Sequence, residues 1–456
     1  MTAGAASARR GDLTDIADRV VGWARDHEAV EVVVGRSRHT EVRAYNADVE
    51  SLSSAEGMGV GIRVVLGDRQ GFAYAATFDD DALAETLVEA RDNAGFATPD
   101  PHVGLAEPDG AAVPDLDLFR PSLLDVPTER KVSLALELEA AVKGADDRIS
   151  GVESAEFVDA MGESCVASTT GIRSESASTA CYVAVSCLAE ADGLTQTGFG
   201  FSVGRELDDI VVTDASDDAV MRSTRLLGST KPASTRTTVV LDPYVTAMVI
   251  GIIGSTLSGE AVLKGRSPFA DRLGDEVGSP MVTLVDDATN PLAYTASATD
   301  GEGLASRRNA LINDGVLQMF VHNAYTGRWA GAASTGSAVR GGFKSTPGVG
   351  CRALSLAPGE LDQPALLRQV GDGVLISSVI GLHSGVNPVS GDFSSGAEGL
   401  RITGGELGAP LREFTIASTL QRMLRDVEAV GNDVDWLPMS AAGVSLVLGD
   451  VTISGT

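Results

Sequence analysis

The sequence predicts an α+β protein in which N-terminal α/β units with an antiparallel sheet precede a large β-rich C-terminal domain. Two observations carry this prediction. A helix–strands–helix pattern occurs twice before residue 230, and short β-branched runs separated by glycine dominate the rest of the chain. At 456 residues, with 43% hydrophobic and 21% charged residues, the chain is long enough for two or three compact units.

We divide the chain into four segments on this basis. They are residues 1–100 as an N-terminal α+β unit, 101–125 as a linker, 126–230 as a middle α+β unit, and 231–456 as the β-rich C-terminal domain. The linker is rich in Pro, Asp and Gly, as is typical of long connections.

The first unit opens with an amphipathic helix over residues 12–27, where apolar side chains recur at helical spacing. Its strands are expected over EVVVGRS, HTEVRAYN and VGIRVVLGDRQGFAYAA, because β-branched residues dominate these runs. Residues 66–71 form the predicted hairpin turn. Asp79 is expected to cap a second helix that continues to Glu89.

The middle unit repeats this order of elements. Thr128 is expected to cap a helix that ends near Val142, and residues 216–227 form the closing helix. Between them, runs of alternating apolar residues predict strands over 151–160, 165–173, 177–189 and 194–203.

The third segment begins with a strand over 237–241. Asp242 and Pro243 then form an N-cap with proline at the first helical position, so a helix is predicted from Tyr244 to about Val262. The remainder is rich in Gly and short β-runs, and its last helix is expected to end near Leu424.

Charge and cysteine content limit the environment and the partners of the protein. The formal net charge of −28 repels phosphate backbones, so we expect no nucleic-acid partner. The four cysteines are widely spaced without a CxxC pair, which is typical of reduced thiols. Because the N-terminus lacks the apolar run of a signal peptide and no apolar stretch can span a bilayer, we predict a cytoplasmic protein without a membrane partner.

Six phrases occur in an order that resembles the TldD/PmbA family. They are GMGVGIRVVLGDRQGFAYA (57–75), LDPYVTAMVIGIIGSTLSGEAVLKGRSPF (241–269), TDGEGLASRRNALINDGVL (299–317), STGSAVR (334–340), GLHSGVNPVSGDFSSGAEGLRI (381–402) and the tail VGNDVDW…LVLGDVTISGT. Single phrases are weak signals, but six in register extend over most of the chain from about residue 40.

The resemblance implies a metal motif on the predicted helix that follows residue 241. TldD-type members of the family are similar to zinc peptidases that carry H-E-x-x-x-H there, with two imidazoles to bind Zn²⁺ and a glutamate to activate water. Counted back from Lys264-Gly265, the motif falls on 250–255. Ile250 and Ser255 then occupy the histidine positions, and Gly251 occupies the glutamate position.

These substitutions remove the metal ligands and the general base, because isoleucine cannot bind zinc and glycine cannot take up a proton. The resemblance also implies a downstream cysteine as the third metal ligand, and no cysteine follows Cys351. We therefore expect no catalytic residue, no metal and no cofactor in this chain. Gly251, Gly254 and Gly259 are explained as small residues that let the helix pack closely against a sheet.

The departure from the motif resembles the TldE/PmbA type of subunit. The resemblance implies a heterodimer in which a TldD-like subunit supplies zinc and hydrolyses unfolded peptides inside a chamber, while this chain forms part of the wall. The candidate wall residues are Asp300, Glu302, Arg307, His383 and Asn387. Two alternatives remain: an active metallopeptidase with an unrecognised site, for example around His383, and a stand-alone homodimer that binds peptides.

Overall fold

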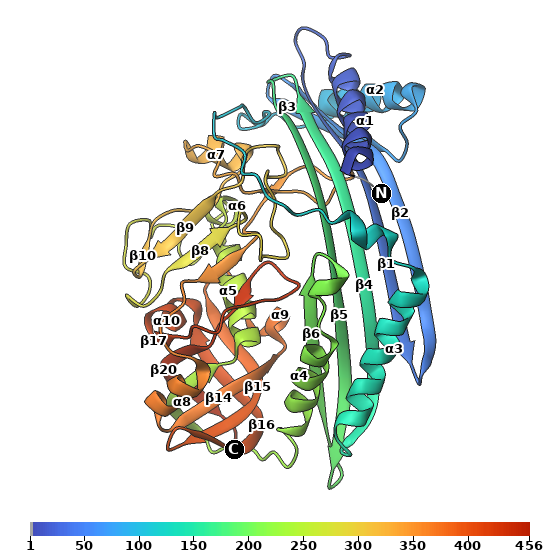
Figure 1. Ribbon diagram of the computed structural model, residues 1–456. Helices are drawn as coiled ribbons and strands as arrows, with labels where there is room; N and C mark the ends of the chain where they lie inside the picture. Colours follow the sequence, from blue (N-terminus) through green and yellow to red (C-terminus); the bar gives the residue numbers. More distant parts are fainter. Residues whose placement is uncertain (1–2) are drawn as a thin grey trace.

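The computed structural model describes residues 3–456, and its N-terminal half is built on one six-stranded sheet (Figure 1). The strand order is β3-β2-β1-β4-β5-β6, and each neighbouring pair is antiparallel. The strands are β1 (Ala29–Tyr45), β2 (Asp48–Leu66), β3 (Arg69–Ala75), β4 (Ile149–Ser168), β5 (Arg173–Ala191) and β6 (Leu194–Gly204). Because β1 pairs with β4, strands from residues 1–100 and from 126–230 share this sheet.

The long strands correct two sequence predictions. EVVVGRS and HTEVRAYN are one strand, β1, and the runs predicted at 151–160 and 165–173 are joined in β4, which ends at Ser168. The glycines in these runs do not end the strands, because pairing continues through them: Gly35 lies opposite both Gly59 and Ser164.

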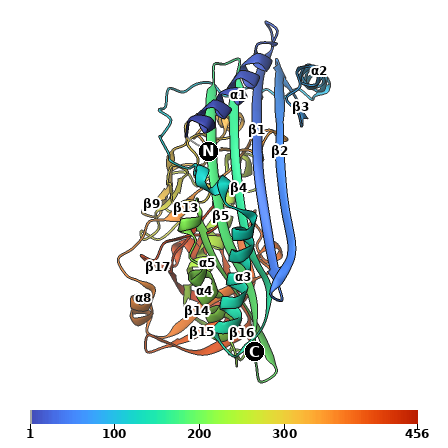
Figure 2. The same cartoon turned by 45° about the vertical axis from the view of Figure 1, so that its right-hand side comes forward.

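Four helices cover one face of the sheet, and the C-terminal domain lies against the other (Figures 1 and 2). They are α1 (Ala3–Val21), α2 (Asp80–Phe96), α3 (Thr128–Ala145) and α4 (Val212–Thr224). The predicted apolar stripe of α1 is buried from Leu13 to Val21, where the helix packs mainly on β4 and β1. Helices α3 and α4 pack on β4 and β5 around Phe157 in a second core.

The helix boundaries differ from the predicted ones in several places. Helix α1 begins at Ala3 rather than at residue 12, because its first turns are rich in alanine. The Asp79 cap is confirmed, with the carboxylate accepting from the N–H of Ala82 at 3.1 Å, but α2 continues to Phe96. Thr128 is the first residue of α3 rather than its cap, and α4 begins at Val212 and ends at Thr224 rather than spanning 216–227.

A ring of strands forms the centre of the C-terminal domain. Strand β7 (Thr235–Leu241) pairs in parallel with β14 (Gly373–Ile380), and β15 (Asp392–Thr403), β16 (Glu406–Thr419) and β20 (Leu446–Ser454) follow in antiparallel order. The ring closes because β20 pairs with both β16 and β7. Strand β17 (Val427–Val430) adds to β20.

A second, four-stranded sheet completes this domain in the order β10-β9-β8-β13. Its strands are β8 (Leu284–Asp287), β9 (Arg308–Asn313), β10 (Val316–Leu317) and β13 (Leu354–Leu356). The smaller elements are α6 (Gly259–Leu263), α7 (Ala324–Ala330), α8 (Gln363–Val370), α9 (Leu382–Gly385), α10 (Leu420–Arg425), β11 (Ala338–Val339), β12 (Gly348–Val349), β18 (Asp435–Trp436), β19 (Ala442–Gly443) and two 3-10 turns at Pro121–Asp125 and Leu207–Asp209. The predicted α+β class with a β-rich C-terminal domain is confirmed.

Helix α5 (Pro243–Thr256) lies in the core between the ring and the second sheet. Its predicted start is confirmed, since Asp242 accepts from the N–H of Tyr244 at 3.2 Å. The predicted continuation to Val262 is wrong. The backbone of Leu257 and Gly259 bonds to Val321 on a neighbouring segment, and Ser258 is extended. The chain then turns into the separate short helix α6.

None of the helices in the described residues is both long enough and apolar enough to cross a bilayer.

The turn between β1 and β2 contains a strained alanine. Asn46 and Ala47 have φ angles of 55° and 60°, the pattern of a type I′ hairpin, where glycine is preferred at the second position. The N–H of Ala47 donates to the Glu139 carboxylate at 2.8 Å, which holds the turn against α3.

We expect Ala47→Gly to raise the free energy of unfolding of the N-terminal half by about 0.5–1 kcal/mol, because glycine adopts a positive φ without steric cost. Urea unfolding followed by circular dichroism measures this. The matched control, Ala44→Gly, is two residues before the turn at a fully buried strand position and should instead lower stability by about 1 kcal/mol. Equal effects of the two changes would contradict the assignment of strain to Ala47.

Candidate functional site

A cavity of about 860 Å³ lies between the sheet and loops of the C-terminal domain. Its floor is a patch of small residues from four strands: Gly35 and Ser37 of β1, Gly57 of β2, Gly162 and Ser164 of β4, and Ser176 and Ser178 of β5. The sheet register aligns these positions in rows, since Ser37 lies opposite both Gly57 and Gly162, and Ser178 lies opposite Gly162. Because these side chains are short, the space above the sheet stays open.

The roof consists of loop residues 297–301 and 338–344, together with Arg352. Asp300 is turned into this wall, where its carboxylate accepts from the N–H groups of Glu302 (2.9 Å), Leu304 (3.0 Å) and Ala338 (3.0 Å). Burial nevertheless raises the pKa of Asp300 above its ordinary value. Arg340 donates to the carbonyls of Gly301 and Ser345, both at 2.9 Å, so two roof loops are joined by one guanidinium.

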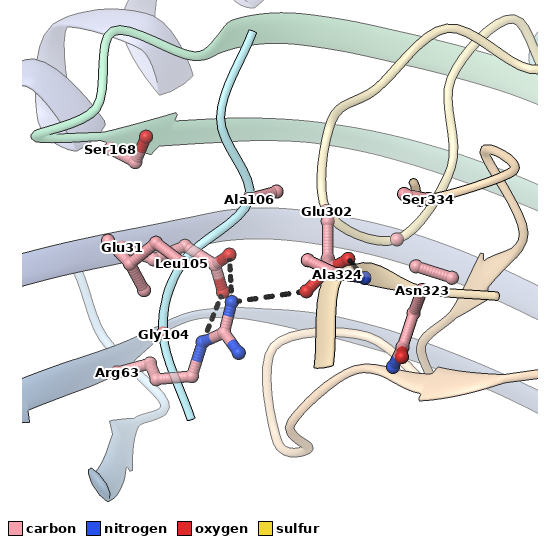
Figure 3. Close-up of polar contacts among 12 residues, drawn as sticks. Glu31, Arg63, Gly104, Leu105, Ala106, Ser168, Glu302, Asn323, Ala324 and Ser334 are labelled. Carbon is pink, nitrogen blue, oxygen red and sulfur yellow. Dashed lines mark hydrogen bonds and ion pairs between the residues drawn. The ribbon is translucent and has the colours of Figure 1, made fainter. Parts of the chain in front are cut away.

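Behind the cavity, a buried cluster of four charged side chains connects the sheet to the C-terminal domain. Figure 3 shows three of them, Glu31, Arg63 and Glu302. Arg63 of β2 binds both oxygens of Glu31 on β1, at 3.1 and 2.6 Å. The same guanidinium lies 3.5 Å from Glu302, and Arg340 donates to Glu31 at 2.5 Å. All four side chains are at most 5% exposed. The cluster therefore contains two cations and two anions that neutralise each other.

The two carboxylates of this cluster respond to burial differently. Burial alone would raise the pKa of Glu31, but the charges of Arg63 and Arg340 outweigh it and lower that pKa. Burial raises the pKa of Glu302, which Arg63 only partly offsets. Glu302 also accepts from the N–H of Ala324 at 2.8 Å, at the first turn of α7. Glu302 thereby connects the cluster to that helix.

The predicted linker runs as an extended segment over α7. Arg328 of that helix donates to the carbonyls of His102 (2.8 Å), Gly104 (2.6 Å) and Leu105 (3.0 Å). Arg307 contacts Asp109 of the same segment and donates to Ser334 at 3.3 Å. The wall candidate Arg307 thus anchors the segment that follows the first unit.

The structure separates the remaining wall candidates from the cavity. His383 and Asn387 are exposed on the segment after β14, and neither lines the cavity. The Asn387 side chain accepts from the N–H of Val389 at 2.9 Å and so shapes its own turn. Of the five candidates, only Asp300 lines the cavity, and Glu302 lies behind it.

The positions assigned to the metal motif face different surroundings on α5. Ile250 is 1% exposed and packs in the core of the C-terminal domain, Gly251 is half-buried, and Ser255 is exposed with its hydroxyl bonded to the carbonyl of Ile252 at 2.7 Å. Five residues advance a helix by about 500°, which places positions 250 and 255 about 140° apart. These two side chains do not converge.

Close packing explains two of the three glycines for which it was predicted, Gly254 and Gly259 but not Gly251. A methyl group on Gly254 would lie 2.2 Å from the Leu354 side chain of β13, and one on Gly259 would lie 2.3 Å from His322. A methyl group on Gly251 would meet nothing within 4 Å, so the packing explanation is wrong for this residue.

Three members of the buried cluster were missed by the sequence reasoning: Glu31, Arg63 and Arg340. The first two carried a signal, since each is a charged residue inside an otherwise apolar β-run, AVEVVVG and VGIRVVLG. Charged residues in such runs are rarely buried unless they are paired.

Comparison with known proteins identifies the family. Residues 234–455 match the PmbA/TldA metallopeptidase C-terminal domain, 121–227 match the central domain, and 30–94 match domain 1. The chain belongs to the PmbA/TldD family. It is 27% identical over 431 residues to metalloprotease PmbA of Escherichia coli O157:H7, covering 94% of this chain and 92% of that protein. A PmbA homologue from Haemophilus influenzae is 28% identical, with the same coverage.

Solved structures of PmbA/TldD-like proteins share the fold. A Thermotoga maritima protein described as a modulator of DNA gyrase has a TM-score of 0.89 at 23% identity, covering 96% of this chain and 99% of that one. TldE from Thermococcus kodakarensis has a TM-score of 0.88 at 21% identity, covering 98% and 99%.

The zinc ion implied by the metallopeptidase family does not fit the residues of α5 in this chain. Ile250 offers no lone pair and is enclosed by apolar side chains, and Gly251 has no side chain to take up a proton. In the described part of the chain, no three His, Cys, Asp or Glu side chains gather where they could hold a metal ion.

We expect Glu31→Gln to lower the free energy of unfolding by about 3 kcal/mol at pH 7, because it leaves Arg63 and Arg340 with one buried carboxylate between them. The lowered pKa of Glu31 means that its contribution is complete above its ordinary value of 4.5 and is lost as the pH falls through the lower folded value. The loss should therefore shrink below about pH 4.5. Urea unfolding at pH 7 and pH 4 measures both effects.

The control for this change is Glu137→Gln, which breaks an ion pair with Arg130 whose side chains are 51% and 48% exposed. It should cost less than about 1 kcal/mol. Similar losses in the two variants would contradict the role given to the buried cluster.

We expect Ile250→Ala to destabilise the C-terminal domain by about 2–4 kcal/mol, because it leaves a cavity in a closely packed core. Ile252→Ala, on the half-buried face of the same helix, should cost clearly less. Thermal unfolding of both variants gives the comparison. Equal costs would indicate that position 250 is not enclosed as described.

Proposed function

We propose that this chain is a non-catalytic, TldE/PmbA-like subunit of a TldD/TldE-type zinc metallopeptidase complex that degrades or processes unfolded peptides. In this proposal a TldD-like subunit holds the zinc ion and hydrolyses the peptide bond. This chain contributes part of the enclosing wall and is inactive when purified alone.

The observation that carries the proposal is the packing of Ile250. A peptidase of this kind needs two metal-binding imidazoles and a general base on the helix after β7. Here the first ligand position is filled by an aliphatic side chain in the domain core, and the base position is a glycine. The chain belongs to a metallopeptidase family although this helix lacks metal ligands. A partner subunit that holds the metal accounts for both facts.

The buried charge cluster supports a wall role for the cavity side of the molecule. Glu31, Arg63, Glu302 and Arg340 hold the sheet and the roof loops at a fixed separation. A chamber needs walls that keep their spacing when they contact a flexible substrate. We assign the complex to the cytoplasm, since the four cysteines are free and three of them are buried.

The test is metal content and peptide hydrolysis, with and without a partner. Purified alone, this chain should contain far less than one zinc per chain by plasma mass spectrometry, and it should not cleave unfolded peptides. With a TldD-like subunit carrying H-E-x-x-x-H, hydrolysis should appear together with a complex in gel filtration, and a chelator should abolish it.

One tightly bound zinc per isolated chain, or chelator-sensitive hydrolysis by the chain alone, would instead support an active metallopeptidase. A stable homodimer that ignores the TldD-like subunit would support a stand-alone scaffold.

A further inference from the structure

Strand β2 has a long open edge. It extends from Asp48 to Leu66, and along its whole length it pairs with β1. On its other side, β3 pairs only with Val60–Leu66. Residues 48–59 therefore present one row of backbone N–H and C=O groups with no strand beside them, over about 40 Å at the rise of a β-strand.

Neither helices nor loops cover this part of β2. From Asp48 to Met58 nine of eleven residues are exposed, including Leu52 at 46% and Met58 at 50%. The segment contains no proline and no lysine, the residues with which sheet proteins usually protect their edges. An exposed edge of this length is a template for an additional strand.

The open edge leads into the cavity. Glu56, Gly57 and Met58 line the cavity, as does Ala76, which follows the end of β3. A strand added beside residues 48–59 would continue the line of β3 in the sheet and reach the cavity at one end. There, the hydroxyls of Ser37 and Ser178 on the floor make no hydrogen bond within residues 3–456, so they can accept or donate to a ligand.

Charge limits what can occupy the edge. Its charged residues are Asp48, Glu50 and Glu56, with no basic residue among 48–59. Arg43 of β1 pairs with Glu50 at 2.7 Å, whereas Asp48 and Glu56 form no ion pair with the described chain. A second copy of the same edge would bring carboxylates against carboxylates, which is unfavourable between neighbouring strands. A neutral or basic strand is complementary.

We infer that the open edge of β2 binds an extended, neutral or basic polypeptide segment as an additional strand, with one end of the segment in the cavity. This inference rests on the proposed function. It places a binding site for the peptide substrate of the complex on the non-catalytic subunit. Backbone pairing supplies the affinity, so recognition depends little on side-chain sequence. The acidic edge then favours lysine- and arginine-containing segments over acidic ones.

The first test uses fluorescence anisotropy of fluorescein-labelled decapeptides with the isolated chain. The probes are five Thr-Lys repeats and five Thr-Glu repeats. The lysine peptide should bind at least tenfold more tightly than the glutamate peptide. Asp48→Lys combined with Glu56→Lys should weaken binding of the lysine peptide at least tenfold.

The matched control is Asp81→Lys combined with Glu85→Lys, which makes the same charge change at two exposed positions of α2. It should bind the lysine peptide like the unchanged protein. Equal losses in both double variants, or equal affinity for both peptides, would overturn the inference.

Hydrogen–deuterium exchange distinguishes strand addition from attraction between charges. With the lysine peptide bound, the outward amides of residues 48–59, which alternate along the strand, should exchange at least tenfold more slowly. Unchanged exchange at these amides would overturn the inference. So would their protection by a TldD-like subunit that also blocks the peptide, since the edge would then belong to the subunit interface. Zinc binding or hydrolysis by the isolated chain would refute the proposed function but would leave these binding results intact.

Discussion

The arrangement of this protein depends on one buried ion-pair cluster. Arg63 and Glu31 come from neighbouring strands of the N-terminal sheet, while Glu302 and Arg340 come from loops of the C-terminal domain. Each cation has an anion within hydrogen-bond reach, so the desolvation of four charges is offset only when the two halves are in register. Apolar contacts tolerate small displacements of one half against the other, but this directional network does not. It therefore fixes the position of the loops relative to the sheet.

The cavity follows from that fixed separation together with the small residues on the sheet. Rows of Gly and Ser leave a smooth floor, and the loops held by Arg340 form the roof. Most charges around the space are already bound within the wall, as with Asp300 and its three N–H donors. The Gly and Ser positions of the floor add backbone groups and hydroxyls that can bond to a ligand, and Glu56, Met58, Phe343 and Lys344 line the same space.

Patterns of neighbouring residues predicted correctly those elements whose conformation depends on nearby residues alone. The buried stripe of α1, the Asp79 cap, the start of α5 and the turn before β3 all depend on residues within a few positions of one another. Predictions failed where distant pairing decides the outcome. Gly35 does not interrupt β1, because strands on both sides hold it extended, and α5 ends early because Val321 pairs with the backbone beyond it.

The candidate site divides in the same way. The assignment of residues 250, 251 and 255 to the metal motif needs only one phrase of the sequence, because the motif lies within a single helix, and it stays a prediction. The charge cluster could not, since Arg63 and Glu302 are 239 residues apart and only the tertiary fold brings them together. Glu31 and Arg63 can be recognised as charged residues in apolar β-runs, but the neighbouring sequence does not indicate which residues pair with them.

The closure of the C-terminal ring bears on how the molecule is made. Strand β7 needs β20 on one side, and β20 also holds β16, so the ring is incomplete until residues 446–454 have been synthesised. The six-stranded sheet, whose last strand ends at Gly204, can form much earlier during translation. For that interval Arg63 and Glu31 face solvent without their partners from the second half. Arg63 and Glu31 therefore stay in contact with water until the C-terminal domain has placed Glu302 and Arg340 beside them.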